Sequence, residues 1–275
     1  MKVVLAENYG FCFGVKRAIK IAEEHPDSST LGPLIHNKLE INRLKLDFNV
    51  GLYDTLSDVK KNDTVIIRTH GIPKDELARV KQIASKVINA TCPFVTTPQQ
   101  IVKKMSEENY SIVIFGDSSH PEVMGVKSYG DDVHIVLEKD EIDKCDFKFE
   151  KIAVVAQTTR NKEKYLEIVN HLILGHKEVR VFNTICDATF ENQAAAEKLS
   201  NNCDVVIIIG GKNSSNTKQL LEICKKNCAS SYLIEDENEL NESWFNGKNV
   251  CGVTAGASTP EWIINRVVEK LKSIK

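Results

Sequence analysis

Three of the eight cysteines share a sequence setting that could hold a metal cluster. Cys12, Cys92 and Cys186 each follow a predicted strand and precede a predicted helix. Thiolates at strand-to-helix turns can converge on one centre, and soft sulfur ligands without histidines at matching spacing favour an iron–sulfur cluster over zinc. Three protein ligands would leave one metal position open. The sequence therefore predicts a cluster whose open position could take part in chemistry.

The other five cysteines lack this shared setting. They lie at or in predicted strands, on one predicted helix or in a polar loop: Cys203, Cys251, Cys224, Cys228 and Cys145. A buried cysteine is more often a small hydrophobic group than a ligand, and we expect that role for these five. The sequence has no Cys-x-x-Cys pair, which disfavours a zinc ribbon or a two-cysteine redox site.

Polar segments after other predicted strands carry groups suited to anions and protons. His36, His70 and His120 follow such strands, at the edge where α/β folds bind ligands. Glu122 follows His120 in a predicted loop, and partial burial would raise its pKa toward the range useful for a proton donor. Taken alone, each histidine could be a hydrogen-bonded structural residue, and Glu122 an exposed loop side chain.

A glycine- and serine-rich segment from Gly210 to Thr217 ends a predicted strand and opens a predicted helix. Glycines let the backbone approach a ligand, and helix N–H groups with small hydroxyls suit phosphate oxygens. The spacing is not that of a Walker loop. Segments 157–159 and 255–261 also follow predicted strands and contain small hydroxyl residues. Each could be only a helix cap, but their shared place at strand ends favours an anion site.

Short β-branched runs alternate with amphipathic helical patterns along the whole chain. This alternation predicts an α/β fold of parallel strands with right-handed crossovers. A capping box with proline at the first helical position is predicted at 97–100. The predicted strands are Val3–Ala6, Val50–Tyr53, Thr64–Arg68, Ser111–Phe115, Val133–Leu137, Ile152–Ala156, Val179–Phe182, Asp204–Ile209 and Asn249–Val253.

The order of elements after each cysteine repeats, and the repeat closes on itself. Residues 12–91 form a first predicted lobe, 92–185 a second and 186–275 a third. The third lacks its final strand, which residues 1–11 supply. We expect three pseudo-equivalent α/β lobes in a cyclic, pseudo-threefold arrangement around a central iron–sulfur site.

Composition narrows the class of protein further. The 275 residues are 42% hydrophobic and 27% charged, with a net charge of −2, so no basic excess suggests a nucleic-acid binder. The first residues leave no room for a signal peptide before polar Glu7, and no apolar run approaches the roughly 20 residues of a membrane helix. A cytoplasmic protein is expected. In that reducing compartment, cysteines serve metal binding or remain thiols rather than disulfides.

Seven motifs together resemble the 4-hydroxy-3-methylbut-2-enyl diphosphate reductases (LytB/IspH-type family), and the match spans almost the whole chain. Members complete the non-mevalonate isoprenoid pathway, and their three-lobed fold agrees with the cyclic repeat. The motifs are Gly-Phe-Cys-Phe-Gly-Val at 10–15, Ala-Thr-Cys-Pro at 90–93, His-Pro-Glu-Val at 120–123, Gln-Thr-Thr at 157–159, Asn-Thr-Ile-Cys at 183–186, Asn-Ser-Ser-Asn at 213–216 and Thr-Ala-Gly-Ala-Ser at 254–258.

The resemblance implies a reductive dehydroxylase that makes isopentenyl and dimethylallyl diphosphate. Cys12, Cys92 and Cys186 would hold a 4Fe–4S cluster whose fourth iron has no protein ligand. Glu122 would deliver protons and Thr158 would lie near the substrate hydroxyl. Electrons would come from a ferredoxin- or flavodoxin-like protein. The remaining substrate-binding residues implied are His36, His70, His120, Ser214, Ser215, Asn216 and Ser258.

This sequence departs from the family pattern at three places. Thr69 stands where serine or alanine is expected, Asn192 where arginine is usual, and Asp187 puts a carboxylate beside a cysteine ligand. Three other classes of protein remain as alternatives. Other three-lobed, three-cysteine enzymes, such as quinolinate synthase and the diphthamide-forming radical enzymes, lack the His-Pro-Glu and Asn-Ser-Ser-Asn combination. An iron–sulfur sensor would need an effector module, and a nucleotide-binding α/β protein would have only incidental cysteines.

Overall fold

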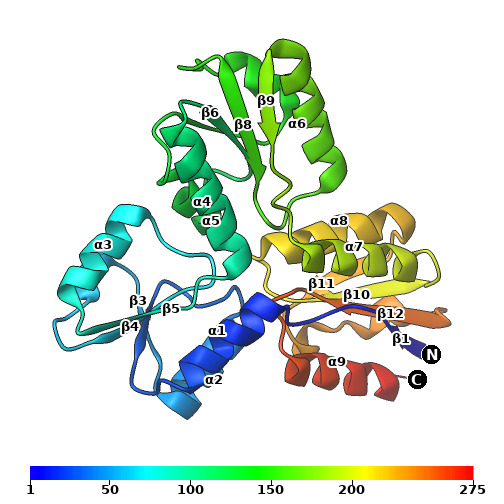
Figure 1. Ribbon diagram of the computed structural model, residues 1–275. Helices are drawn as coiled ribbons and strands as arrows, with labels where there is room; N and C mark the ends of the chain where they lie inside the picture. The colour runs from blue at the N-terminus through cyan, green and yellow to red at the C-terminus, as the bar shows by residue number, and fades with distance from the viewer. Residues whose placement is uncertain (275) are drawn as a thin grey trace. The chain divides into compact units, whose positions relative to one another are not determined.

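Residues 1–274, which the computed structural model describes, contain three four-stranded parallel sheets with one shared strand order (Figure 1). In each sheet the first strand lies between the second and the third, and the fourth flanks the third. The predicted α/β fold with parallel strands is confirmed. The orders are β3-β2-β4-β5, with β2 (Ser29–Leu31), β3 (Gly51–Tyr53), β4 (Thr64–Ile67) and β5 (Lys86–Asn89); β7-β6-β8-β9, with β6 (Ser111–Phe115), β7 (Val133–Val136), β8 (Lys151–Ala156) and β9 (Glu178–Val181); and β11-β10-β12-β1, with β10 (Val205–Ile209), β11 (Ser231–Ile234), β12 (Val250–Ala255) and β1 (Lys2–Leu5).

The N-terminal strand completes the third sheet, as the cyclic repeat predicts. β1 pairs in parallel with β12, with Lys2 opposite Val250 and Leu5 opposite Val253. It therefore occupies the place that β5 and β9 hold in the first and second sheets. The predicted lobe boundaries and the arrangement of the lobes about a centre stay predictions.

Three strands have no counterpart among the nine predicted ones: β2, β5 and β11. Each is only three or four residues long and contains serine, lysine or asparagine. These polar residues interrupt the β-branched runs on which the strand prediction depends, and the place of each strand is fixed by its neighbours in the sheet instead.

The helices lie between these strands, and most match the predicted alternation. One prediction is wrong: Pro98 is not near the start of a helix but inside α4, which begins at Pro93 after Cys92. Pro93 provides the favourable first-turn proline, and the hydroxyls of Thr96 and Thr97 both donate to its carbonyl. The helices are α1 (Phe13–Glu23), α2 (Lys38–Phe48), α3 (Lys74–Ile83), α4 (Pro93–Glu107), α5 (Pro121–Lys127), α6 (Lys162–Gly175), α7 (Asp187–Ser200), α8 (Ser215–Asn227) and α9 (Glu261–Ser273), with 3-10 turns at Leu56–Asp58, Lys139–Lys144, Glu237–Glu239 and Glu242–Phe245.

The chain divides by its internal contacts into two compact units. Unit 1 comprises Met1–Lys16, Ile35–Arg43 and Asp187–Lys275; unit 2 comprises Arg17–Leu34 and Leu44–Cys186. Unit 1 contains the third sheet, and unit 2 contains the first and second. The segment Ile35–Arg43 thus packs with the third sheet, although it lies within the predicted first lobe.

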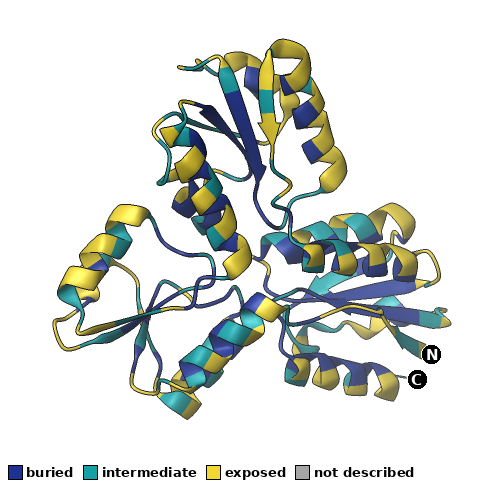
Figure 2. Cartoon of the chain, viewed as in Figure 1, coloured by how far each residue is buried: buried dark blue, intermediate teal, exposed yellow. Residues whose placement is uncertain are grey.

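Helices cover both faces of the sheet in unit 1. Along β10, Val205, Ile207 and Ile209 pack in the core with α9, while Val206 and Ile208 pack with α7 and α8. All five residues are fully buried, which explains the unbroken β-branched run (Figure 2). Burial of each such side chain contributes roughly 1.5–3 kcal/mol.

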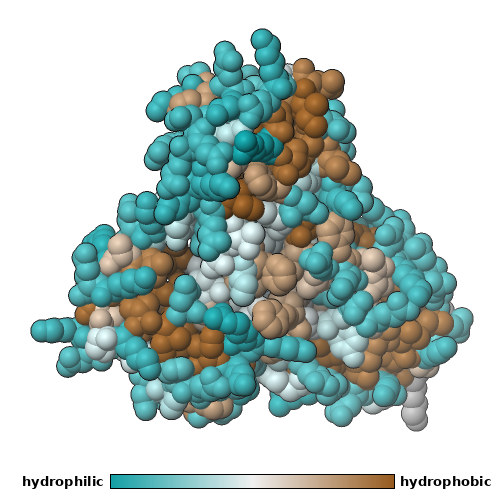
Figure 3. All heavy atoms as spheres, viewed as in Figure 1, coloured by the Kyte–Doolittle hydropathy of each residue, from teal (hydrophilic) through white to brown (hydrophobic). Residues whose placement is uncertain are grey.

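The second sheet, in unit 2, is covered on one face by α4 and α5. Val102 of α4 and Val123 of α5 share a core with Ile112 of β6 and Ala153 of β8. On α6, hydrophobic side chains remain exposed, including Leu174 at 90%, and Figure 3 shows hydrophobic groups over this helix. Among residues 1–274, every helix is too short or too polar to qualify as a membrane span.

Candidate active site

The three cysteines that the sequence singles out lie at equivalent points of the three sheets. Each follows the fourth strand of its sheet and immediately precedes the first residue of a helix, α1, α4 or α7. The N–H of each cysteine donates to the carbonyl of the second residue after the third strand of the same sheet. These bonds join Cys12 to Ala257 (3.1 Å), Cys92 to Thr69 (3.0 Å) and Cys186 to Thr158 (2.9 Å).

This repeated bond fastens every cysteine to a loop that carries a predicted substrate residue. Ala257 precedes Ser258, Thr69 precedes His70, and Thr158 is itself predicted to contact substrate. The repeat seen in the sequence thus extends to individual backbone hydrogen bonds.

The setting of the three cysteines suits thiolate ligands. All three are partly accessible and stand at the start of a helix, where unpaired N–H groups and the helix dipole favour negative charge. Burial raises the pKa of Cys224 and of Cys251 to about 12, which keeps these thiols neutral. Among residues 1–274, none of the eight cysteines forms a disulfide.

Glu122 is buried and held at one end of a short helix. It is 2% exposed and lies in the first turn of α5, not in a loop as the sequence predicted. His120 caps this helix, and its Nδ1 accepts from the N–H of Glu122 at 3.2 Å. Helix periodicity could not reveal α5, because the helix has only seven residues.

Thr158 donates two hydrogen bonds to the Glu122 carboxyl group, one from its backbone and one from its side chain. Its backbone N–H donates to Oε1 at 2.7 Å, and its hydroxyl donates to Oε2 at 2.8 Å. Burial raises the pKa of Glu122, although the two Thr158 hydrogen bonds and the nearby Arg160 charge oppose the rise. A carboxyl group with a raised pKa retains its proton to higher pH and can donate it.

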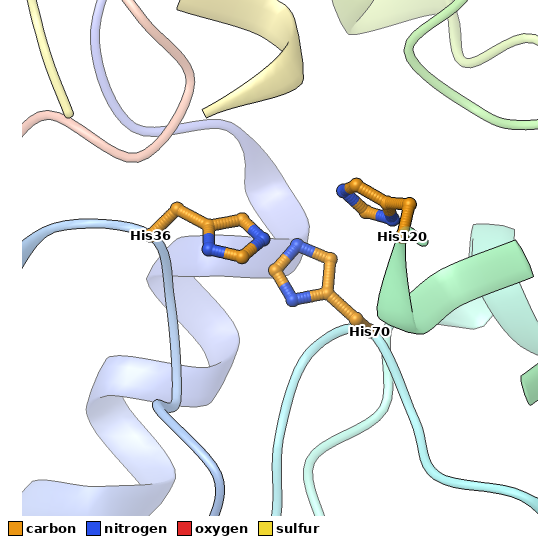
Figure 4. Close-up of side chains that lie close together, drawn as sticks. All are labelled: His36, His70 and His120. Atoms are coloured by element: carbon orange, nitrogen blue, oxygen red, sulfur yellow. The ribbon is translucent and has the colours of Figure 1, made fainter. Parts of the chain in front are cut away.

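Two predicted substrate histidines lie together in unit 2. The rings of His70 and His120 meet edge to face, with centroids 5.3 Å apart (Figure 4). Both follow inner strands of their sheets, β4 and β6. At the first departure from the family pattern, the hydroxyl of Thr69 donates to the Leu34 carbonyl at 2.6 Å, a bond that serine could also make and alanine could not.

His36 belongs to unit 1, where it lies beside another predicted substrate residue. The hydroxyl of Ser258 donates to the His36 carbonyl at 3.4 Å. Gly211 also approaches this carbonyl so closely that a Cβ at position 211 would lie 2.3 Å from the oxygen. The loops after β10 and β12 therefore both contact the main chain of His36.

The remaining predicted anion-binding residues open α8. Ser214 is the N-cap, and its hydroxyl accepts from the N–H of Thr217 at 3.3 Å; Ser215 and Asn216 begin the helix. Asn216 is 3% exposed, yet within the described part of the chain neither polar atom of its side chain has a hydrogen-bond partner. Buried polar groups without partners are costly, so this amide is suited to a ligand that supplies the missing bonds.

Thr217, the last residue of the glycine- and serine-rich segment predicted to bind an anion, lies close to two glycines. A Cβ at Gly256 would lie 2.2 Å from its hydroxyl oxygen, and one at Gly210 would lie 2.7 Å away. Thr217 is fully buried directly after Asn216, so the glycines leave the room that lets α8 begin there. Both glycines appear in the predicted anion-binding segments.

Of the other two departures from the family pattern, Asn192 is buried on α7, and Asp187 is the first residue of that helix. A carboxylate in the first turn of a helix is electrostatically favourable.

Comparison with known sequences places the chain in one family. The family model described as LytB protein matches residues 3–272. A relative from a Nitratiruptor species is 62% identical over 275 residues, and one from Helicobacter hepaticus is 57% identical over 274 residues. Both alignments cover 100% of this chain and of the relative, and both relatives are named 4-hydroxy-3-methylbut-2-enyl diphosphate reductase.

Two solved structures are also similar. One is an (E)-4-hydroxy-3-methyl-but-2-enyl diphosphate reductase described as the terminal enzyme of the non-mevalonate pathway, with 43% identity, a TM-score of 0.73 and 100% coverage of both chains. The other, the E-1-hydroxy-2-methyl-but-2-enyl-4-diphosphate reductase from Plasmodium falciparum, is 29% identical with a TM-score of 0.90 and covers 99% of this chain and 88% of that one. The chain belongs to the LytB protein family, as its motifs predicted.

Proposed function

We propose that this chain is an oxidoreductase that converts (E)-4-hydroxy-3-methylbut-2-enyl diphosphate to isopentenyl and dimethylallyl diphosphate, the last step of the non-mevalonate pathway. The names of its full-length relatives support this reaction. The observation that carries the proposal is the position of Thr158. This residue accepts a hydrogen bond from Cys186 and donates two to the buried Glu122. One residue thus joins a proposed cluster ligand to the proposed proton donor.

The reaction breaks the carbon–oxygen bond of an allylic alcohol and forms a carbon–hydrogen bond. Two electrons and two protons enter, and water leaves. A 4Fe–4S cluster held by Cys12, Cys92 and Cys186, with its fourth iron lacking a protein ligand, would supply Lewis acidity and single-electron transfers. The donor set of three thiols at helix N-termini fits such a cluster.

The protein's own groups would manage protons and the diphosphate. Glu122, whose pKa burial raises, would donate a proton to the departing hydroxyl, and the Thr158 hydroxyl would orient that carboxyl group. The diphosphate would bind the histidines and the helix-opening amide and hydroxyl groups, where the α8 dipole also favours anions. The residues proposed for this binding are His36, His70, His120, Ser214, Ser215, Asn216 and Ser258.

The two electrons require an external donor, and we propose a ferredoxin- or flavodoxin-like protein. A cytoplasmic location stays a prediction.

Anaerobic turnover tests the proposed function directly. Purified protein should show a broad absorption band near ~400 nm, typical of an iron–sulfur cluster. With a chemical reductant it should convert the hydroxylated diphosphate to both five-carbon products. A protein with the absorption band but without turnover would favour the sensor alternative. A protein without bound iron would favour a nucleotide-binding protein with incidental cysteines.

A further inference from the structure

Within unit 1, a buried carboxylate joins the segment that carries His36 to helix α9. Glu40 lies four residues after His36, in the first turn of α2, and is 1% exposed. Its N–H donates to Oδ1 of Asn37 at 3.0 Å, which caps the helix immediately after His36. A shift of Glu40 would therefore also move the backbone of His36.

The carboxylate of Glu40 accepts hydrogen bonds from two side chains, Arg43 and Trp262. Arg43 donates from Nη2 to Oε1 at 2.7 Å and from Nε to the same oxygen at 3.0 Å. The indole Nε1 of Trp262 donates to Oε2 at 2.9 Å. Both oxygens are thus engaged, as a buried carboxylate requires.

Trp262 links this carboxylate to the loop that carries Ser258. It is the second residue of α9, which begins immediately after the 256–260 loop. Arg266, one turn further along α9, lies over the indole ring at 4.9 Å and restricts its orientation. The bond between Glu40 and Trp262 therefore joins the start of α2 to the start of α9, in parallel with the weaker contact between Ser258 and the His36 carbonyl.

We propose that Glu40 and Trp262 are positioning residues that set the spacing between His36 and Ser258 for the diphosphate of the substrate. The inference rests on the proposed function, because it assigns these two loops to the diphosphate. The carboxylate–indole bond holds the two helix starts together, and Arg43 keeps the carboxylate oriented. Loss of the bond leaves the helices in place but lets the two ligand groups separate.

The experiment combines steady-state kinetics with binding of inorganic diphosphate to the cluster-loaded protein. Trp262→Phe removes one donor and keeps an aromatic ring, and Glu40→Gln removes the charge and keeps the shape. Trp262→Phe should raise KM, and the dissociation constant for inorganic diphosphate, by about three- to tenfold, the effect of one lost hydrogen bond. Glu40→Gln should raise both by less, because its amide oxygen can still accept from the indole N–H. kcat and the absorption near ~400 nm should stay close to wild type.

A double variant and a matched control separate positioning from general stability. If the two residues act through one bond, Trp262→Phe combined with Glu40→Gln should cost less than the product of the single effects. Glu237→Gln is the control, because it removes a more distant ion-pair partner of Arg266 on α9. It should leave KM and diphosphate binding unchanged.

Three results would overturn the proposal. The first is a Trp262→Phe variant that melts at a lower temperature but binds diphosphate as wild type does. The second is an equal rise in KM for Glu237→Gln, and the third is fully multiplicative effects in the double variant. If wild-type protein binds diphosphate but does not reduce the substrate, the proposed function fails while the positioning role can still be measured by binding.

Discussion

The carboxyl edges of the second and third sheets offer opposite kinds of polar group. At the second sheet, Glu122 is buried and each of its oxygens accepts one hydrogen bond from Thr158. At the third sheet, neither polar atom of the buried Asn216 side chain has a hydrogen-bond partner among residues 1–274. We propose that the first edge supplies a proton, whereas the second binds an anion. Equivalent positions in repeated sheets have thus acquired different chemistry.

Removal of a proposed cluster ligand should have the largest effect, because it abolishes chemistry at both edges. Cys92→Ser and Cys186→Ser should each lose bound iron, the absorption near ~400 nm and all turnover, since a hydroxyl is a poor ligand for iron. Cys145→Ser and Cys203→Ser are matched controls and should keep their iron. Iron that persists in Cys12→Ser, Cys92→Ser and Cys186→Ser alike would refute the ligand assignment.

Glu122→Gln tests the proton edge alone. Turnover should fall by ~10²–10⁴-fold, the usual contribution of a general acid, while iron content and diphosphate binding stay unchanged. A variant that works at nearly the wild-type rate would transfer the proton role to a relay through Thr158 and the diphosphate. A variant that loses its iron would make Glu122 a structural residue.

The same residue predicts a pH dependence. Because burial raises the pKa of Glu122, the unfolded chain releases this proton at lower pH than the folded chain does. The free energy of unfolding should therefore fall as pH rises from the ordinary carboxyl pKa to the raised one. Turnover should fall on the alkaline side of the raised pKa. Both changes should be smaller in Glu122→Gln, as denaturant titrations and rate profiles across pH would measure.

Asn216→Ala tests the anion edge and should separate binding from stability. Affinity for inorganic diphosphate should fall by roughly 10–100-fold, because hydrogen bonds to charged groups are lost. The free energy of unfolding without ligand should stay equal or rise, since a buried amide without partners disappears. Calorimetry and denaturant unfolding give both quantities. Unchanged affinity in both Asn216→Ala and His36→Ala would place the phosphates elsewhere.

Thr69→Ala should have the smallest effect. It removes the bond from the hydroxyl to the Leu34 carbonyl, worth ~1 kcal/mol of stability, while the backbone bond between Thr69 and Cys92 remains. Iron content should be normal and KM should change by only a few-fold. A loss of iron comparable to that of Cys92→Ser would show that the hydroxyl, and not only the backbone, holds the cysteine loop.

The general architecture could be predicted from the sequence because it depends on the alternation of strands and helices and on their repeat after each cysteine, which extend over many elements. The buried run of β10 and the three similar cysteine turns were enough to predict parallel sheets and a strand borrowed from the N-terminus. Short elements without a clear hydrophobic pattern, such as β2 and α5, were missed, although β3 is equally short and was predicted.

The contacts of Ile35–Arg43 with the third sheet could not be predicted. They depend on single side-chain pairs distant in sequence, such as Glu40 and Trp262. A role that belongs to a sequence motif can be predicted from the sequence. A role that depends on one hydrogen bond between distant residues cannot.

The borrowed strand also sets the order in which the protein can be completed during synthesis. β1 is made well before its partner β12 and before the Ala257 carbonyl that accepts from the N–H of Cys12. Such distant pairing makes folding of the third sheet slow relative to local helix formation. Cys12 is therefore the last of the three cysteines to gain its backbone partner. A chain that stops before β12 would present Cys92 within a formed sheet but leave Cys12 without its backbone partner, so we expect such a chain to take up iron poorly.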